Sequence, residues 1–183
     1  ALGALPAVSP SRVLGANERV QIGMLGTGGR GRYHIGWLER TSTIEPLKVI
    51  AACDIWNVQR EQAKAEIEKR FQDTPALYKD YRELLEQKDI DAVLVATPDH
   101  WHSPITVAAL EAGKDVYVEK PVSNAIEPAL KMVEAAANSK QVVQVGCQQR
   151  SWQHFQDWSK RVREGYLGNI NHCVMLFGGG GGG

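Results

Sequence analysis

Short apolar segments alternate with amphipathic segments along most of the chain, and this alternation limits the fold more than any other feature. The apolar segments predict strands at Val20–Leu25, Leu47–Cys53, Ala92–Ala96, Val116–Val118, Val142–Val145 and Ile170–Phe177. The segments between them predict helices at Tyr33–Arg40, Val58–Phe71, Tyr81–Gln87, Pro104–Ala112, Glu127–Asn138 and Trp152–Glu164. Most of the strands are continuously apolar, which is typical of strands buried on both faces. The pattern predicts an α/β fold, a doubly wound parallel sheet with helices on both faces.

Composition and charge exclude several classes of protein. The chain carries 21 Lys and Arg against 21 Asp and Glu, so a nucleic-acid partner is not predicted. With 43% hydrophobic residues it is not a disordered chain, and no run of about 18 apolar residues offers a membrane span. The three cysteines, Cys53, Cys147 and Cys173, fit neither a disulfide framework nor a zinc pattern. Cys53 and Cys147 lie in apolar stretches and are expected to be buried.

The sequence divides into four parts. Residues 1–18 are mostly small and apolar, and they fit either a flexible arm or the remnant of a secretory signal, so the protein is either periplasmic or secreted, or else cytoplasmic. Residues 19–150 contain the regular alternation and are expected to form one domain. Residues 151–177 are expected to begin a second α/β domain that is cut short, and residues 178–183 are all glycine.

A glycine-rich loop follows the first predicted strand. Its residues are Gly26, Thr27, Gly28, Gly29, Arg30 and Gly31, which match the pattern G-x-G-x-x-G. In this context the first glycine allows a tight turn, the second lets a pyrophosphate approach the backbone, and the third lets the helix pack closely on the strand. The helix N-terminus offers N–H groups to the phosphates, and Arg30 either adds positive charge or points to solvent. The loop predicts a dinucleotide site in a Rossmann domain.

An aspartate ends the second predicted strand. Asp54 follows the last loop glycine by about 20 residues, the position of the acid that accepts hydrogen bonds from the ribose hydroxyls of NAD and repels the 2′-phosphate of NADP. Ile55, Trp56 and Asn57 add no cation that would favour this phosphate, and Trp56 is a candidate to stack on the adenine. NAD is therefore the predicted cofactor, with Ile55 beside it. The alternative is a turn aspartate that caps the helix beginning near Asn57.

Polar residues follow the other predicted strands, where ligands of such sheets bind. Residues 97–102 read Thr-Pro-Asp-His-Trp-His, residues 119–121 read Glu-Lys-Pro, and residues 146–150 read Gly-Cys-Gln-Gln-Arg. With the glycine loop, Asp54 and residues 78–85, these segments resemble in order and spacing the N-terminal domain of the Gfo/Idh/MocA family of sugar and inositol oxidoreductases. The resemblance covers about residues 19–177. The first residues resemble the end of the twin-arginine export signal of secreted members, without the twin arginine itself.

The resemblance implies roles for individual residues. Lys120 matches the cleft lysine that contacts the substrate hydroxyl and the nicotinamide ribose, and Pro121 helps to aim it. His102 matches a histidine close to the nicotinamide, so Lys120 and His102 are the candidate catalytic residues. Glu119 matches an acid that is structural or contacts the cofactor. The remaining candidate cofactor contacts are Thr97 and Pro98, in a turn beside the cofactor, and Arg150, at the junction with the next domain.

Plainer interpretations compete with these roles. A lysine before a proline is most often part of a solvated turn. His100 and His102 lie two residues apart, but no third ligand has suitable spacing, so no metal site is predicted. His34, His154 and His172 have no supporting context and are expected at the surface or satisfied in the core.

Three functions remain open. The first is an NAD-dependent oxidoreductase that transfers a hydride from a sugar, cyclitol or related polyol to nicotinamide, with this chain as its cofactor-binding part. The second is a glycosidase of the same superfamily that oxidises its substrate transiently around an elimination step. The third is a non-catalytic nucleotide-binding module. The family resemblance places the general base and much of the sugar pocket in the second domain, so this chain alone is expected to be inactive, and the intact protein is expected to be a homo-oligomer.

Overall fold

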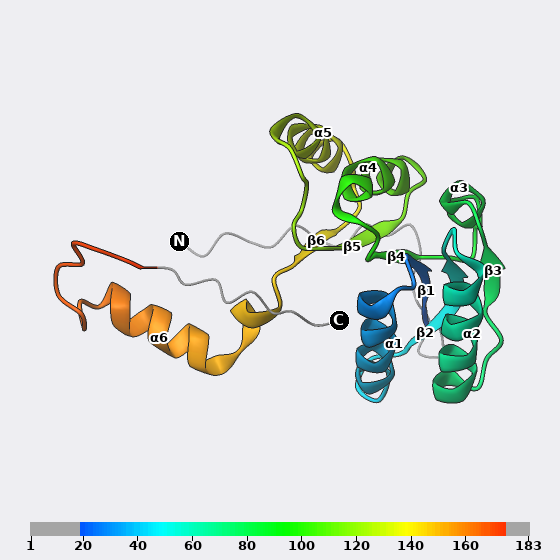
Figure 1. Ribbon diagram of the computed structural model, residues 1–183, viewed down its shortest axis with the longest axis horizontal. Helices are drawn as coiled ribbons and strands as arrows, with labels where there is room; N and C mark the ends of the chain where they lie inside the picture. Colours follow the sequence, from blue (N-terminus) through cyan, green and yellow to red (C-terminus); the bar gives the residue numbers. More distant parts are fainter. Residues whose placement is uncertain (1–18, 175–183) are drawn as a thin grey trace. The chain divides into compact units, whose positions relative to one another are not determined.

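The computed structural model describes residues 19–174 and contains a six-stranded parallel sheet (Figure 1). Its strand order is β3-β2-β1-β4-β5-β6. The strands are β1 (Val20–Leu25), β2 (Leu47–Cys53), β3 (Ala76–Tyr78), β4 (Ala92–Val95), β5 (Asp115–Glu119) and β6 (Val143–Gly146). From β1 the chain adds β2 and β3 on one side of the sheet, and then β4, β5 and β6 on the other side. This change of direction between β1 and β4 places a crevice at the carboxyl ends of these two strands.

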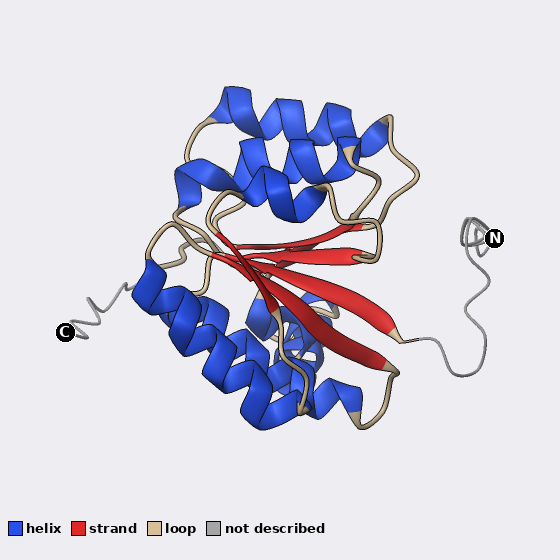
Figure 2. Ribbon diagram, turned by 90° about the vertical axis from the view of Figure 1, so that its right-hand side faces the viewer, coloured by secondary structure: helices blue, strands red, loops and turns tan. Residues whose placement is uncertain are grey.

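Helices cover both faces of this sheet (Figure 2). They are α1 (Gly29–Ser42), α2 (Asn57–Phe71), α3 (Tyr81–Leu85), α4 (His102–Glu111) and α5 (Ile126–Ala137), with a 3-10 turn η1 (Asp99–Trp101) before α4. Residues of α1 and α2 pack in one core cluster, and residues of α3, α4 and α5 pack in another. The predicted α/β fold is confirmed.

Neighbouring strand residues explain why the central strands are apolar throughout. In β4, Leu94 belongs to the α1–α2 cluster, whereas Val93 and Val95 belong to the cluster with α3, α4 and α5. In β1, Met24 and Leu25 divide in the same way. Because side chains alternate between the faces of a strand, a sheet covered on both sides requires apolar residues at every position.

The chain divides into two compact units after Gly146. The described part of the second unit contains a 3-10 turn η2 (Gln148–Ser151) and the amphipathic helix α6 (Gln153–Arg163). Residues 170–174 form no strand, so this part of the prediction for Ile170–Phe177 is wrong. A strand requires a hydrogen-bonded neighbour, and no described strand pairs with these residues. Residues 175–177, like the N-terminal segment 1–18 and the glycines 178–183, lie outside the described residues.

The cysteines differ in their surroundings. Cys53 ends β2 and is buried, as expected, and this burial, with smaller effects from neighbouring charges, raises its pKa to about 12. Cys147 is exposed, so its expected burial is wrong, because the chain has left the sheet at this position. Among residues 19–174, no helix is long and apolar enough to cross a membrane.

Candidate cofactor site

The glycine loop is tightly packed on one side and open on the other. Gly26 has φ +85°, and a Cβ there would lie 2.6 Å from the backbone nitrogen of Thr97. A Cβ on Gly31 would lie 2.1 Å from the carbonyl oxygen of Gly26, so only glycine lets α1 approach β1 this closely. By contrast, a Cβ on Gly28 or Gly29 would meet no atom within 4 Å. The loop is therefore closed toward the sheet and leaves free space where a phosphate would approach the backbone.

The start of α1 adds N–H groups to this open side. Its N-cap is Gly28, and no side chain caps the helix. Amides in the first turn of a helix have no partner within the helix, and the positive end of the helix dipole favours an anion beside them. The open space and the uncapped helix start both fit the pyrophosphate of a dinucleotide.

Asp54 connects the ends of β1 and β2. Its Oδ2 accepts a hydrogen bond from Thr27 N at 2.8 Å, with Thr27 Oγ1 at 3.4 Å, and its Oδ1 accepts one from Trp56 N at 2.9 Å. The bond to Trp56 is the turn contact that the alternative interpretation required, although Trp56 rather than Asp54 is the N-cap of α2. Since each carboxylate oxygen has capacity for more than one donor, these bonds orient Asp54 and still allow ribose hydroxyls to bind.

Two large apolar side chains stand beside Asp54. Ile55 and Trp56 are 82% and 56% exposed. The Arg60 guanidinium donates a hydrogen bond to the Asp54 carbonyl oxygen at 2.5 Å. Sequence reasoning missed this arginine, although its position in the first turns of α2 points back toward the end of β2. An exposed indole beside Asp54, the predicted ribose acceptor, fits the predicted adenine contact.

The Glu119 carboxylate, at the end of β5, accepts hydrogen bonds from three groups. Its Oε1 accepts them from Arg30 Nη2 at 2.8 Å and from His34 Nε2 at 2.6 Å, and its Oε2 accepts one from Lys120 N at 3.2 Å. Glu119 is 3% exposed. The His34 ring also packs against the Tyr117 ring in a T-shaped arrangement, with ring centroids 5.5 Å apart. Arg30 therefore has a structural contact that neither expectation included, because its guanidinium connects the glycine loop to the end of β5.

Burial and charge act in opposite directions on this carboxyl group. Burial alone raises the pKa of Glu119, but the hydrogen bonds and charges of Arg30 and His34 together outweigh it and hold the pKa below its ordinary value. Burial is the main effect on His34 and lowers its pKa, although the neighbouring Glu119 opposes that shift. The site thus contains an ionised carboxylate, the Arg30 cation and a neutral imidazole that donates Nε2–H.

Acid is therefore expected to destabilise the domain in two stages. The folded pKa values of His34 and Glu119 both lie below their unfolded values, so the unfolded chain takes up protons first as the pH falls. The contribution of His34 to the free energy of unfolding is complete above about pH 6.5 and is lost as the pH falls below that value. The contribution of Glu119 is complete above about pH 4.5 and is lost at still lower pH. Thermal unfolding followed by circular dichroism from about pH 8 to about pH 3 measures both stages. His34→Gln should remove the first stage, and an unchanged profile in this variant would contradict the assignment.

His102 is buried, and its ring lies between the chain segments that follow β4 and β5. It is 2% exposed, with Nδ1 2.6 Å from the Pro121 carbonyl oxygen and Nε2 2.9 Å from the Thr97 carbonyl oxygen. Both ring nitrogens thus lie within hydrogen-bond distance of a backbone carbonyl oxygen after β4 or β5, and because a carbonyl oxygen only accepts, each of these bonds requires an N–H on that nitrogen. The predicted contact of His102 with nicotinamide stays a prediction.

The remaining predicted residues lie in different parts of the structure. Lys120 is exposed, and no described residue forms an ion pair with its amine. The Thr97 hydroxyl is buried and finds no hydrogen-bond partner among residues 19–174, and Pro98 is the N-cap of η1. Arg150 belongs to the second unit, so its cofactor contact stays a prediction.

Sequence reasoning also missed His34 as part of this site. It was expected only at the surface or satisfied in the core, and it is 8% exposed and hydrogen-bonded to Glu119. One signal was present in the sequence: Arg30 and His34 lie four residues apart and therefore on one face of α1.

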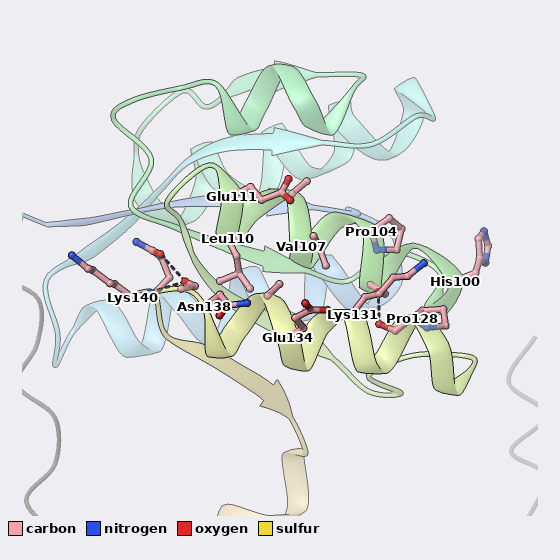
Figure 3. Close-up of a pocket in the computed structure, with 15 residues that line it drawn as sticks. His100, Pro104, Val107, Leu110, Glu111, Pro128, Lys131, Glu134, Asn138 and Lys140 are labelled. Atoms are coloured by element: carbon pink, nitrogen blue, oxygen red, sulfur yellow. Dashed lines mark hydrogen bonds between the residues drawn. The ribbon is translucent and has the colours of Figure 1, made fainter.

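A separate groove of about 980 Å³ runs between α4 and α5 (Figure 3). Pro104, Val107 and Leu110 of α4 line it opposite Lys131 and Glu134 of α5. None of the predicted cofactor residues lines this groove. Within the described chain, no three His, Cys, Asp or Glu side chains gather closely enough to hold a metal ion.

Solved structures with a similar fold include inositol dehydrogenases from Lactobacillus casei. A myo-inositol dehydrogenase in complex with NAD(H) and myo-inositol is 30% identical, with a TM-score of 0.71 over 82% of this chain and 43% of that one. A scyllo-inositol dehydrogenase with bound NAD(H) and scyllo-inositol is 26% identical, with a TM-score of 0.73 over 84% of this chain and 43% of that one.

The chain is also similar to curated bacterial glycosidases. Glycosyl hydrolase family 109 protein 1 of Shewanella sp. is 33% identical over 127 residues, which are 67% of this chain and 27% of that protein. An alpha-N-acetylgalactosaminidase of Shewanella oneidensis is 32% identical over the same shares of the two chains. The chain thus spans less than a third of the length of these relatives. Residues 20–147 match the family model GFO_IDH_MocA, described as "Oxidoreductase family, NAD-binding Rossmann fold". The expected family and cofactor are confirmed, and this chain belongs to the Gfo/Idh/MocA oxidoreductase family and contains its NAD-binding domain.

Proposed function

We propose that the protein oxidises a hydroxyl group of a sugar, cyclitol or related polyol, and that this chain binds the NAD that accepts the hydride. One observation carries the proposal. The Arg30–Glu119 ion pair joins the glycine loop to the end of β5, and the exposed Lys120 is the next residue along the chain. The two inositol dehydrogenases support the substrate class, because both were solved with NAD(H) and a cyclitol.

In this proposal, some residues of the chain bind the cofactor, and Lys120 orients the substrate hydroxyl and stabilises its developing charge. The glycine loop and the start of α1 hold the pyrophosphate, and Asp54 accepts hydrogen bonds from the adenosine ribose. When bound, NAD supplies the hydride acceptor. Lys120 donates a hydrogen bond to the substrate hydroxyl oxygen and stabilises the negative charge that grows there as the proton leaves. The group that takes this proton is expected in the rest of the protein, so residues 1–183 alone are expected to bind NAD without oxidising a polyol.

The family 109 relatives favour a second candidate function. In a glycosidase of this kind the substrate is oxidised, undergoes elimination and hydration, and is reduced again by the same cofactor, so that no NADH is released. The domain described here would serve both reactions in the same way. What distinguishes them is whether the cofactor leaves in its reduced form.

The experiment compares both reactions in the intact protein. NADH absorbance is followed with a panel of free sugars and cyclitols, and release of the phenol is followed with nitrophenyl glycosides, including the N-acetylgalactosaminide. Accumulation of NADH with a free polyol supports the dehydrogenase. Cleavage of a glycoside without net NADH supports the second candidate, and absence of both reactions with NAD binding retained supports a non-catalytic module.

Lys120→Met is expected to lower kcat of the intact protein by about 10²- to 10⁴-fold, because it removes the cation that polarises the hydroxyl. The matched control is Lys140→Met, an exposed lysine after α5 that lines the separate groove. It should leave kcat within about twofold. Retention of full activity by Lys120→Met would remove Lys120 from the mechanism.

A further inference from the structure

The two residues that flank Lys120 are each held by a buried histidine from a different helix. Glu119 precedes it, and its Oε1 lies 2.6 Å from Nε2 of His34 on α1. Pro121 follows it, and its carbonyl oxygen lies 2.6 Å from Nδ1 of His102 at the start of α4. We propose that His34 and His102 are positioning residues that brace the 119–121 turn and thereby orient the Lys120 amine. This inference rests on the proposed function only for what Lys120 does.

Each brace has a second attachment in the domain. Nε2 of His102 lies 2.9 Å from the Thr97 carbonyl oxygen after β4, and this contact is a second hydrogen bond where Nε2 as well as Nδ1 carries a proton, because a carbonyl oxygen only accepts. His34 is fixed by its place on α1 and by the ring of Tyr117 on β5. The turn is therefore joined on one side to the helix that starts at the glycine loop, and on the other to the neighbouring strand end. A movement of either element would be passed to Lys120.

A brace is useful here because lysine is flexible. Its side chain has many rotamers, and holding a substrate hydroxyl requires most of them to be given up. A fixed main chain at residues 119–121 reduces the directions in which the amine can point before any ligand binds, which is preorganisation of the site. The Lys120 N–H itself donates to Glu119 Oε2, so the carboxylate that His34 holds also holds the main chain of the lysine.

Hydrogen exchange followed by mass spectrometry tests the braces in the full chain without cofactor. His34→Leu and His102→Leu are each expected to speed exchange in residues 117–124 by about tenfold, while residues 47–53 of β2 keep their protection. The glutamine variants, which retain an N–H donor, should restore slow exchange. His100→Leu is the matched control, because His100 is an exposed histidine on η1. Equal exchange in the leucine variants and the unmutated chain would overturn the proposal, as would faster exchange spread over the whole domain.

Nuclear magnetic resonance of the ¹⁵N-labelled imidazole gives a second measurement that needs no variant. If His34 holds an ionised Glu119, its neutral ring must carry the proton on Nε2. The Nδ1–H tautomer would overturn the brace at His34.

Ligand binding then tests the effect on the site. In the proposed site AMP would occupy only the adenosine side, whereas NAD would extend toward Lys120, so His34→Leu is expected to weaken NAD binding by about tenfold and AMP binding by less than about twofold. Equal losses for both ligands would mean general damage and would overturn the proposal. If the unmutated chain binds neither ligand, the proposed function fails, whereas the exchange and tautomer measurements still decide whether the braces exist.

Discussion

Gly28→Ala is expected to lower the affinity of the chain for NAD by at least about tenfold and to leave its thermal midpoint unchanged. The backbone at Gly28 has φ −65°, which alanine adopts freely, and a Cβ there meets no protein atom within 4 Å. The added methyl group would therefore cost no protein contact. It would instead occupy the space through which the pyrophosphate reaches the backbone. Calorimetric titration with NAD and thermal unfolding measure the two effects separately.

Gly31→Ala provides the contrast within the same loop. Its Cβ would lie 2.1 Å from the backbone oxygen of Gly26, which cannot rotate away as a side chain would. Helix α1 must then move off β1, at a cost of about 1–3 kcal/mol or more in the free energy of unfolding. This variant should lose both stability and NAD binding. If Gly28→Ala bound NAD as tightly as the unmutated chain, the phosphate assignment of the loop would be wrong.

The unmutated chain is expected to bind NAD more tightly than NADP, and Asp54→Asn should reduce this preference by about tenfold or more. The amide retains one oxygen for the hydrogen bonds from Thr27 or Trp56 but lacks the negative charge that repels a 2′-phosphate. The Arg60 guanidinium, which donates to the Asp54 carbonyl oxygen, supplies a cation near this position. Asp54→Ala would also reduce the preference, but it would leave the buried Thr27 N–H without its acceptor and cost about 1–3 kcal/mol. Affinities measured calorimetrically for both cofactors give the ratio directly.

Asp80→Asn is the matched control for Asp54. Asp80 follows β3 as Asp54 follows β2, and its Oδ1 accepts the N–H of Arg82 two residues later, as Asp54 accepts that of Trp56. Each aspartate accepts the same kind of local turn hydrogen bond, but only Asp54 lies beside the glycine loop. Asp80→Asn should leave the ratio of affinities unchanged. Equal affinity of the unmutated chain for NAD and NADP would refute the role of Asp54.

Local patterns were sufficient to predict most of the fold. The predicted strand at Leu47–Cys53 coincides with β2, and the apolar runs also located β1 and β4. The start of α1 was predicted at Tyr33 but lies at Gly29, because glycines have low helix propensity and hide a helical turn that the tight strand–helix contact imposes. Strand β3 was missed because it has only 3 residues and follows Pro75.

Part of the site could be predicted from local sequence and part could not. The glycine loop and Asp54 belong to a motif that is recognised by its spacing in the sequence. The bonds of Glu119 to Arg30 and His34 join residues 89 and 85 positions apart, and no local pattern pairs them. His102 also makes contacts that its motif does not predict. Its position in a family motif suggested a cofactor contact, whereas its burial between two carbonyl oxygens could be learned only from the packing of β4 against β5.

Because of the ion pair between Arg30 and Glu119, the cofactor site is complete only when the strands from β1 to β5 have assembled into the sheet. The partners of this ion pair lie on α1, which follows β1, and on β5, and these elements meet only after β4 has been placed between β1 and β5. A partly assembled chain could contain the glycine loop without this connection to Lys120. The complete site would then exist only in the native state, and NAD would stabilise the assembled domain in proportion to the logarithm of its concentration. The fraction of this domain that is folded would therefore rise with the concentration of NAD.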